Sequence, residues 1–330
     1  MTRVLIYEPT YRRLEAKFAA LGVTFDPVLV NDAGEITVTG QASTAEEAHP
    51  EAVWANHEVF VSPAVRPFMV TMLKSPALKW VQSAAAGFDN PVFGQIIQKG
   101  AKLSTSHGQA LGMAEYVLAG VIDHFQHGPE RRAAQAEKAW RRLAFREILD
   151  SEWLVIGFGA IGQAVAQRAK GFGARITGVR RNQAPHDLAD NIAPMSAIPD
   201  LLPHADVVVL CTPLTVETRH LVDAAFLSAM KPGSVIVNVG RGGLVDEPAL
   251  LAALDAGKPE HAVLDVFETE PLPEDSPFWN HPRVALTPHA SGITSGQWTR
   301  NETLFLDNLK RYLAGEPLLN VADPKDVLAG

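Results

Sequence analysis

The sequence has very little cysteine and no long apolar stretch. Cys211 is the only cysteine among 330 residues, which excludes an intrachain disulfide and a metal site built from several thiolates. No apolar run approaches the roughly 20 residues that a membrane-spanning helix needs. The apolar run that begins at Val4 is also too short for a secretory signal. We therefore expect a cytoplasmic protein that has no membrane partner and holds no metal ion.

Positive charge is also in short supply. The chain has 29 Lys and Arg against 37 Asp and Glu, for a net charge of −8, and this balance disfavours a general nucleic-acid binder. An anionic ligand would have to be held by local positive charge and by helix ends. Apolar residues, in contrast, make up 47% of the chain, which is typical of a globular protein. The length predicts two domains.

Short apolar stretches alternate with helical patterns along the chain, which is typical of parallel α/β sheets. The predicted strands are Arg3–Tyr7, Val59–Val61, Leu78–Gln82, Ala205–Leu210, Ser234–Asn238, Ala262–Val266 and Val284–Leu286. The predicted helices are Tyr11–Leu21, Ala114–Phe125, Ala133–Ile148, Asp246–Ala256 and Thr299–Leu313. The segment 31–47 is polar and contains glycine, and its pattern predicts neither element.

The most informative stretch is residues 153–179, read as WLVIGFGAIGQAVAQRAKGFGARITGV. It predicts strand, tight turn, helix and strand around a G-x-G-x-x-G spacing, the order of a dinucleotide-binding fingerprint. Gly157 permits the tight turn, Gly159 leaves room for a pyrophosphate, and Gly162 lets helix and strand pack closely. The backbone amides at the helix start, around Ala160 and Ile161, are expected to face the anion.

The residues after the second strand of this motif predict NADP(H) in preference to NAD(H). An NAD site usually carries an Asp or Glu there for the ribose hydroxyls, whereas this chain has Arg180 and Arg181. A carboxylate would repel a 2′-phosphate, but a guanidinium can bind it through a charge-assisted pair. The alternative is two solvated surface arginines.

Three ionisable residues follow predicted strands and have complementary chemistry. Arg241 can bind the carboxylate of a 2-oxo acid and polarise its carbonyl. His289 can donate a proton to the carbonyl oxygen as a hydride arrives, and a neighbouring Glu270 favours the protonated imidazole. Each residue alone has an ordinary explanation as a salt bridge, a solvated turn or a packed histidine. In combination they predict an oxidoreductase.

With these motifs the chain resembles the D-isomer-specific 2-hydroxyacid dehydrogenases, most clearly from Met113 to Gly292. The matching segments follow the family's order: MAEYVLAGVIDHF, VIGFGAIGQAVAQRAKGFG, LLPHADVVVLCTPLTVETRHLV, MKPGSVIVNVGRGGLVDEPALLAALDAG, AVLDVFETEPLP and VALTPHASGIT. Arg180 stands where the family's NAD-type members carry an acidic residue. In this respect the chain resembles the NADP-preferring glyoxylate/hydroxypyruvate reductase branch.

The resemblance implies two doubly wound parallel-sheet α/β domains with a cleft between them. A flavodoxin-like substrate domain would comprise residues 1–106 plus 291–330, and a Rossmann cofactor domain would comprise residues 107–290. The resemblance also implies a homodimer formed through the cofactor domain. The stretch Ala133–Ile148, which includes Trp140, would be its arm or else a helix packed on its own domain.

The resemblance further implies a role for each site residue. Arg241 would orient the substrate, His289 would be the general acid/base in contact with substrate and cofactor, and Glu270 would be its acidic partner. Asp265 would contact the nicotinamide carboxamide. The remaining cofactor contacts would be Cys211, Thr212, Pro213, Val239 and Gly240. In the substrate domain, the loop Ser83–Asp89 would hold the substrate carboxylate through amides at Ala85, Ala86 and Gly87, or would be an ordinary strand-to-helix turn.

Together these features predict NADPH-dependent reduction of a small 2-oxo acid, such as glyoxylate or hydroxypyruvate, to the D-2-hydroxy acid. Two alternatives stay open. One is an NAD(P)-sensing interaction protein like the co-repressor branch of the same family, which the lack of a basic patch disfavours. The other is a formate- or phosphite-type dehydrogenase on the same scaffold, to which Gln297 and Arg300 could contribute.

Overall fold

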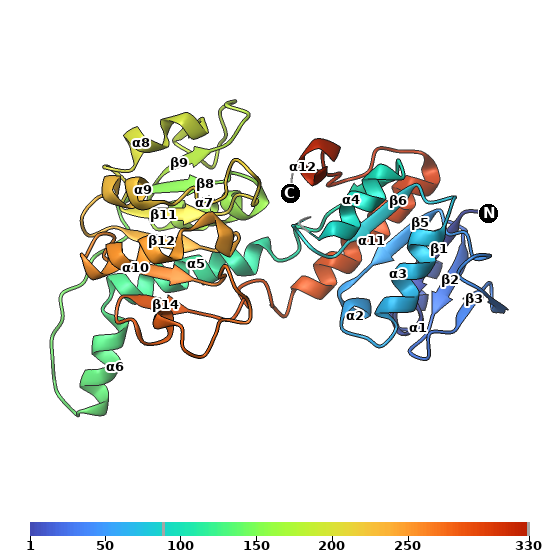
Figure 1. Ribbon diagram of the computed structural model, residues 1–330, viewed down its shortest axis with the longest axis horizontal. Helices are drawn as coiled ribbons and strands as arrows, with labels where there is room; N and C mark the ends of the chain where they lie inside the picture. Colours follow the sequence, from blue (N-terminus) through green and yellow to red (C-terminus); the bar gives the residue numbers. More distant parts are fainter. Residues whose placement is uncertain (88–89, 329–330) are drawn as a thin grey trace. The chain divides into compact units, whose positions relative to one another are not determined.

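The computed structural model describes residues 1–87 and 90–328, and the chain divides into two compact units (Figure 1). The first unit contains residues 1–108 and 295–330, and the second contains Gln109–Thr294. The sequence led us to expect boundaries at 106/107 and 290/291. Which unit binds the substrate and which binds the cofactor stays a prediction.

A seven-stranded sheet of order β4-β3-β2-β1-β5-β6-β7 forms the first unit. Its strands are β1 (Arg3–Tyr7), β2 (Asp26–Val30), β3 (Ile36–Val38), β4 (Gln41–Ser43), β5 (Ala52–Ala55), β6 (Trp80–Ser83) and β7 (Lys102–Ser104). Its helices are α1 (Glu8–Ala20), α2 (His57–Phe60), α3 (Val65–Lys74), α4 (Pro91–Gln98), α11 (Gln297–Ala314) and α12 (Pro324–Leu328). Five strands are parallel, while β3 and β4 add an antiparallel edge from the polar segment 31–47.

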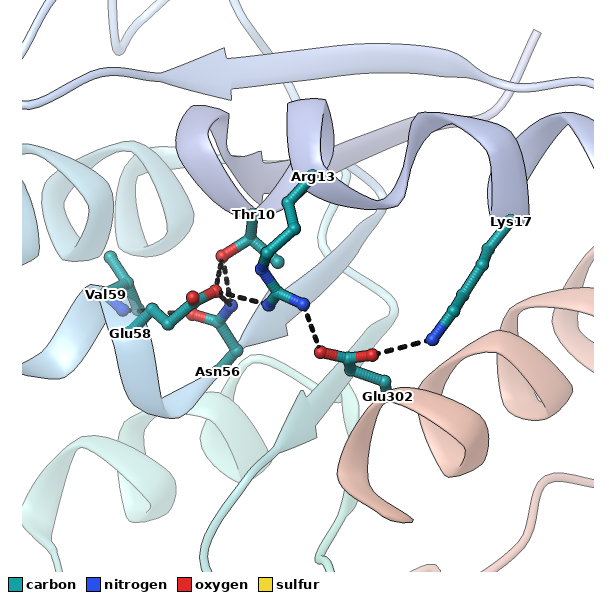
Figure 2. Close-up of polar contacts among 7 residues, drawn as sticks. All are labelled: Thr10, Arg13, Lys17, Asn56, Glu58, Val59 and Glu302. Atoms are coloured by element: carbon teal, nitrogen blue, oxygen red, sulfur yellow. Dashed lines mark hydrogen bonds and ion pairs between the residues drawn. The ribbon is translucent and has the colours of Figure 1, made fainter. Parts of the chain in front are cut away.

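The C-terminal helix α11 belongs to the first unit through both apolar and polar contacts. Phe305 is fully buried and stacks on Trp54 of β5 with ring centroids 4.2 Å apart. Figure 2 shows the polar side, where the Glu302 carboxylate lies between Arg13 and Lys17 of α1. The Arg13 guanidinium also reaches Glu58, at 2.9 Å. These contacts hold the last part of the chain against the first.

The second unit contains a fully parallel sheet of order β10-β9-β8-β11-β12-β13-β14. Its strands are β8 (Glu152–Ile156), β9 (Arg175–Val179), β10 (Asn191–Ala193), β11 (Val207–Leu210), β12 (Val235–Asn238), β13 (His261–Leu264) and β14 (Val284–Leu286). Its α-helices are α5 (Ala110–Phe125), α6 (Gly128–Ala136), α7 (Ala160–Gly171), α8 (Ile198–Leu201), α9 (Ala224–Ala229) and α10 (Glu247–Asp255). Short 3-10 turns occur at η1 (Met195–Ala197), η2 (Gly242–Leu244) and η3 (Pro277–Asn280).

The predicted fold class of two parallel-sheet α/β domains is confirmed. In the second unit the central strands β11 and β12 are buried along their whole length, as expected for a parallel sheet covered on both faces. Within the described ranges, none of the helices is both long enough and apolar enough to cross a membrane.

Two sequence-based element predictions are wrong. The predicted strand Val59–Val61 is instead mostly the short helix α2, because the side chain of Asn56 caps it by accepting a hydrogen bond from the Val59 amide at 3.0 Å. The predicted helix Ala133–Ile148 is also wrong, since α6 ends at Ala136 and Lys138 takes a left-handed φ of 56°. Most of the stretch after α6 has no regular secondary structure.

The segment that contains α6 projects from the sheet of its own unit (Figure 1). Trp140, just after α6, is 93% exposed, so it does not pack on its own domain. Of the two interpretations that the sequence left open for this stretch, the exposed tryptophan favours the arm.

Candidate active site

The ionisable residues that the sequence predicts for catalysis follow three neighbouring strands of the second unit. β13 pairs in parallel with β12 on one side and β14 on the other. Arg241 follows β12, Asp265 and Glu270 follow β13, and His289 follows β14. Because parallel strands end at the same edge of a sheet, these residues share one edge, the edge at which open α/β sheets bind ligands.

Glu270 and His289 form a hydrogen-bonded pair. Glu270 Oε2 lies 2.7 Å from His289 Nδ1, and the other oxygen, Oε1, accepts a hydrogen bond from the Phe267 amide at 2.9 Å. Since Nδ1 faces the carboxylate, Nε2 is the ring nitrogen available for a ligand. Half of the His289 side chain is exposed. The pair therefore has the geometry of an oriented acid/base group.

Asp265 holds the segment that carries His289. Its buried carboxylate accepts hydrogen bonds from the amides of Ala290 (2.8 Å) and Ser291 (3.0 Å) and also contacts the hydroxyl of Thr287. The Asp265 carbonyl accepts from the His289 amide at 2.8 Å. These bonds maintain the positive φ of 50° at His289, a conformation that needs support from its surroundings. The resemblance implied a carboxamide contact for Asp265, whereas here its carboxylate already serves this segment.

Arg241 is half-buried at the end of a short, fixed turn. The Asn238 side chain spans this turn, accepting from the Gly240 amide at 3.0 Å and donating to the Arg241 carbonyl at 2.9 Å. Arg241 Nη1 donates to the Gly240 carbonyl at 2.8 Å. The backbone of the predicted substrate-binding arginine, together with Val239 and Gly240, is therefore held by a polar side chain that ends β12.

The glycine loop between β8 and α7 has the shape of an anion cradle. Gly157 has φ 97°, and a Cβ there would lie 2.5 Å from Cys211 and Thr212 backbone atoms. A Cβ on Gly162 would meet the Gly157 carbonyl oxygen at 2.3 Å, whereas one on Gly159 would meet no described atom within 4 Å. The fold thus requires glycine at positions 157 and 162, whereas Gly159 borders open space.

The start of α7 beside this space is suited to a phosphate. The 12-residue helix has neither a side-chain cap nor an acidic residue in its first turn. Its first residues, Ala160 and Ile161, are half-exposed. Amides at a helix N-terminus bind anions through hydrogen bonds and the helix dipole, so these residues fit the pyrophosphate of a dinucleotide.

Arg180 lies against the same loop. Its guanidinium carbon is 6.0 Å from the centroid of the Phe158 ring, and Nη2 donates to the Ala184 carbonyl at 2.6 Å. Its Nε is buried and has no hydrogen-bond partner within the described part of the chain. Arg181 is exposed. A guanidinium against the glycine loop fits an additional phosphate.

The other predicted cofactor contacts follow β11, the strand next to β8. Cys211 and Thr212 are half-buried and Pro213 is exposed. Backbone atoms of Cys211 and Thr212 face Gly157 so closely that any side chain there would collide with them. These residues form one wall of the glycine loop.

The predicted carboxylate-binding loop belongs to the first unit and follows β6. Ala85 is exposed, while Ala86 and Gly87 are half-buried. The Ala85 amide donates to Ser83 Oγ at 3.0 Å, and the Ala85 carbonyl accepts from the Ser106 amide at 2.8 Å. Phe88 and Asp89, at the end of this loop, lie outside the described residues.

Three site residues were missed by reasoning from the sequence. Asn238 ends an apolar strand, a signal that could have identified it. Thr287 is the first residue of the TPH segment, and its contact with Asp265 joins the segments that follow β14 and β13. Glu247 begins α10, and its carboxylate accepts a hydrogen bond from the Glu268 amide at 2.7 Å; no pattern in the sequence signals this contact.

Comparison with known proteins gives a consistent picture. The model of the D-isomer specific 2-hydroxyacid dehydrogenase NAD-binding domain matches residues 118–291, more than half of the chain. A D-3-phosphoglycerate dehydrogenase of Mycobacterium bovis is 36% identical over 73% of this chain and 46% of its own length. The chain thus spans about half the length of the first such relatives.

Two further relatives are informative. A glyoxylate/hydroxypyruvate reductase A of Yersinia enterocolitica is 30% identical over 66% of this chain and 68% of its own length. A crystal structure from Xanthobacter autotrophicus Py2, described as a D-isomer specific 2-hydroxyacid dehydrogenase in complex with NADPH and MES, is 28% identical. It covers 99% of both chains with a TM-score of 0.78.

Proposed function

Because this chain belongs to the D-isomer-specific 2-hydroxyacid dehydrogenase family, we propose that it reduces a small 2-oxo acid to the D-2-hydroxy acid with NADPH. The observation that carries the proposal is the Glu270–His289 pair, with Nδ1 committed to the carboxylate and Nε2 directed elsewhere. A bound nicotinamide would supply the hydride that the keto carbon gains.

The roles of the protein groups follow from their chemistry. Protonated His289 donates its Nε2 proton to the keto oxygen, so that carbon gains a hydride and oxygen gains a proton. Glu270 holds the ring and stabilises its charged form. Arg241 binds the substrate carboxylate.

The preference for NADPH is supported by charge and by one relative. The Arg180 guanidinium lies against the glycine loop, and residues 180–184 include no carboxylate. The 28% identical structure from Xanthobacter autotrophicus contains NADPH. Glyoxylate or hydroxypyruvate is proposed as the substrate because the 30% identical relative carries that name.

The proposal includes a homodimer formed through α6 and the segment that follows it. Trp140 and Phe145 of this segment are 93% and 50% exposed, and large exposed apolar side chains are typical of interfaces. Sedimentation of the wild type and of Trp140→Ala tests this. A monomeric wild-type protein would exclude the dimer.

Initial rates with a panel of 2-oxo acids of graded size, read as NADPH absorbance, test the reaction. Arg180→Asp should raise KM for NADPH about 10- to 150-fold, because a charge-assisted phosphate contact contributes roughly 1.5–3 kcal/mol, and it should not raise KM for NADH. Arg66→Asp makes the same change at an exposed site of the first unit and should have no effect.

Two outcomes would contradict the proposal. Faster turnover with NADH than with NADPH at equal low concentration would exclude the cofactor preference. Oxidation of formate or phosphite with NADP⁺, without reduction of any 2-oxo acid, would favour the alternative donor chemistry.

A further inference from the structure

The turn that carries Glu270 is held by a carboxylate from another element. Two consecutive amides of this turn point to two different glutamates. The Phe267 amide donates to Glu270 Oε1 at 2.9 Å, and the Glu268 amide donates to Glu247 Oε1 at 2.7 Å. Glu247 is the first residue of α10, and Asp246 caps that helix through the Ala249 amide. Glu247, at the N-terminus of α10, therefore holds a turn that belongs to a different part of the chain.

The opposite side of the turn is tied to the segment that carries Arg241. Glu268 Oε1 lies 2.5 Å from His220 Nε2, and the His220 amide donates to the Gly243 carbonyl at 2.9 Å. A Cβ on Gly242 would lie 1.9 Å from the Phe267 carbonyl carbon. The backbone beside Arg241 thus packs directly against the backbone of the Glu270 turn.

The Glu247 carboxyl lies in an electrostatically unfavourable environment. Burial raises the pKa of the Glu247 carboxyl, and the negative charges of Glu268 and Glu270 raise it further, against the hydrogen bond from the Glu268 amide. A half-buried carboxylate close to two others is costly unless it is hydrogen-bonded. The Glu268 amide supplies such a hydrogen bond to Glu247.

We propose that Glu247 is a positioning residue for proton transfer by His289. It acts through the Glu268 amide, which fixes the turn so that Glu270 keeps one oxygen on the Phe267 amide and the other on His289 Nδ1. Without an acceptor at position 247, the Glu268 amide loses its partner and the Glu270 carboxylate loses its fixed orientation. This inference rests on the proposed reductase function, since proton donation is the step that would be affected.

Two variants separate the hydrogen bond from the charge. Glu247→Gln keeps an oxygen acceptor without the charge, and Glu247→Ala removes the acceptor. We expect Glu247→Ala to lower kcat for 2-oxo acid reduction about 10-fold or more while KM for NADPH stays within about twofold. Glu247→Gln should retain at least about half of kcat. Glu274→Ala, at an exposed glutamate shortly after the turn, is the matched control and should behave as wild type.

A readout that a purely structural role would not move is the pH profile. In Glu247→Ala the pH profile of kcat should differ from that of the wild type, whereas Glu247→Gln should keep the wild-type profile. The ring-proton NMR signals of His289, assigned with His289→Asn, should shift in Glu247→Ala but not in Glu247→Gln, and this measurement needs no turnover.

The inference is overturned if Glu247→Ala keeps both the wild-type kcat and the wild-type ring-proton NMR signals of His289. It is also overturned if Glu247→Gln is as impaired as Glu247→Ala, since the charge would then be the cause. If the wild type reduces no 2-oxo acid, the proposed function fails, and the NMR comparison of the two variants still decides the positioning role.

Discussion

A buried histidine at the start of β13 should make the stability of this protein depend on pH. His261 is the first residue of β13, and its ring stacks on that of His124 of α5, with centroids 4.3 Å apart and planes inclined by 8°. Burial lowers the pKa of His261 from 6.5 to about 4, and the neighbouring charges of His124 and His281 add to this effect, while Asp123 opposes it. His261 is therefore neutral in the folded protein at neutral pH.

The sign and the size of the effect follow from linkage. The unfolded chain binds a proton at His261 near pH 6.5, but the folded chain does so only near pH 4. The contribution to stability is therefore complete above pH 6.5 and is lost as the pH falls from 6.5 towards 4. Between pH 8 and pH 5 this one group should cost about 2 kcal/mol of unfolding free energy.

The variant His261→Phe keeps an aromatic ring for stacking but cannot bind a proton. Urea unfolding at pH 8, 6.5 and 5 measures the effect. The wild type should lose about 2 kcal/mol more than His261→Phe between pH 8 and pH 5. His204→Phe, at an exposed histidine of the same unit, is the control and should follow the wild-type curve. Equal losses in the wild type and His261→Phe would refute the argument.

Other consequences can be tested at single residues. Asp265→Ala removes the acceptor of two backbone amides, so kcat should fall about 100-fold and stability by about 3 kcal/mol, from roughly 1–3 kcal/mol per unpaired group; steady-state kinetics and urea unfolding measure both. Gly159→Ala, with no described atom near its Cβ, should keep the wild-type melting temperature but weaken NADPH binding about 10-fold or more in fluorescence titration, because the new methyl group occupies the pyrophosphate space. Gly157→Ala, with a φ of 97° and a Cβ contact of 2.5 Å, should instead lower the melting temperature. Glu302→Gln breaks the ion pairs of a carboxylate whose side chain is only 9% exposed, so urea unfolding at pH 7 should show a loss of about 1–3 kcal/mol, below the range for fully buried pairs because Arg13 is partly exposed.

The strands and glycines of the second unit could be predicted because their signals are local. β11 and β12 read as continuous apolar runs, which a parallel sheet buried on both faces requires. Gly157 needs a left-handed backbone, and that need is visible in the residue type itself. Val59–Val61 could not be assigned correctly, because a short apolar run fits a strand or a helix equally well. The capping hydrogen bond between Asn56 and the Val59 amide favours the helix.

The helix predicted over Ala133–Ile148 failed for a related reason. An amphipathic pattern predicts a helix only where its apolar face packs on something. In the described chain Trp140 and Phe145 are largely exposed, and the backbone turns left-handed at Lys138. Periodicity carries no information about whether such a partner surface exists.

By itself the sequence determined the kinds of chemistry this protein holds: a glycine loop for a dinucleotide, arginines where an acid is usual, and an Arg, a Glu and a His after successive strands. Only the tertiary structure decided how those groups are aimed. The two carboxylate oxygens of Glu270 contact the Phe267 amide and His289. The Asp265 carboxylate holds the backbone segment that carries His289. The Glu270–His289 and Asp265–Ala290 contacts join residues 19 and 25 positions apart, which follow neighbouring strands. Their geometry depends on the register and packing of the sheet, which no local pattern encodes.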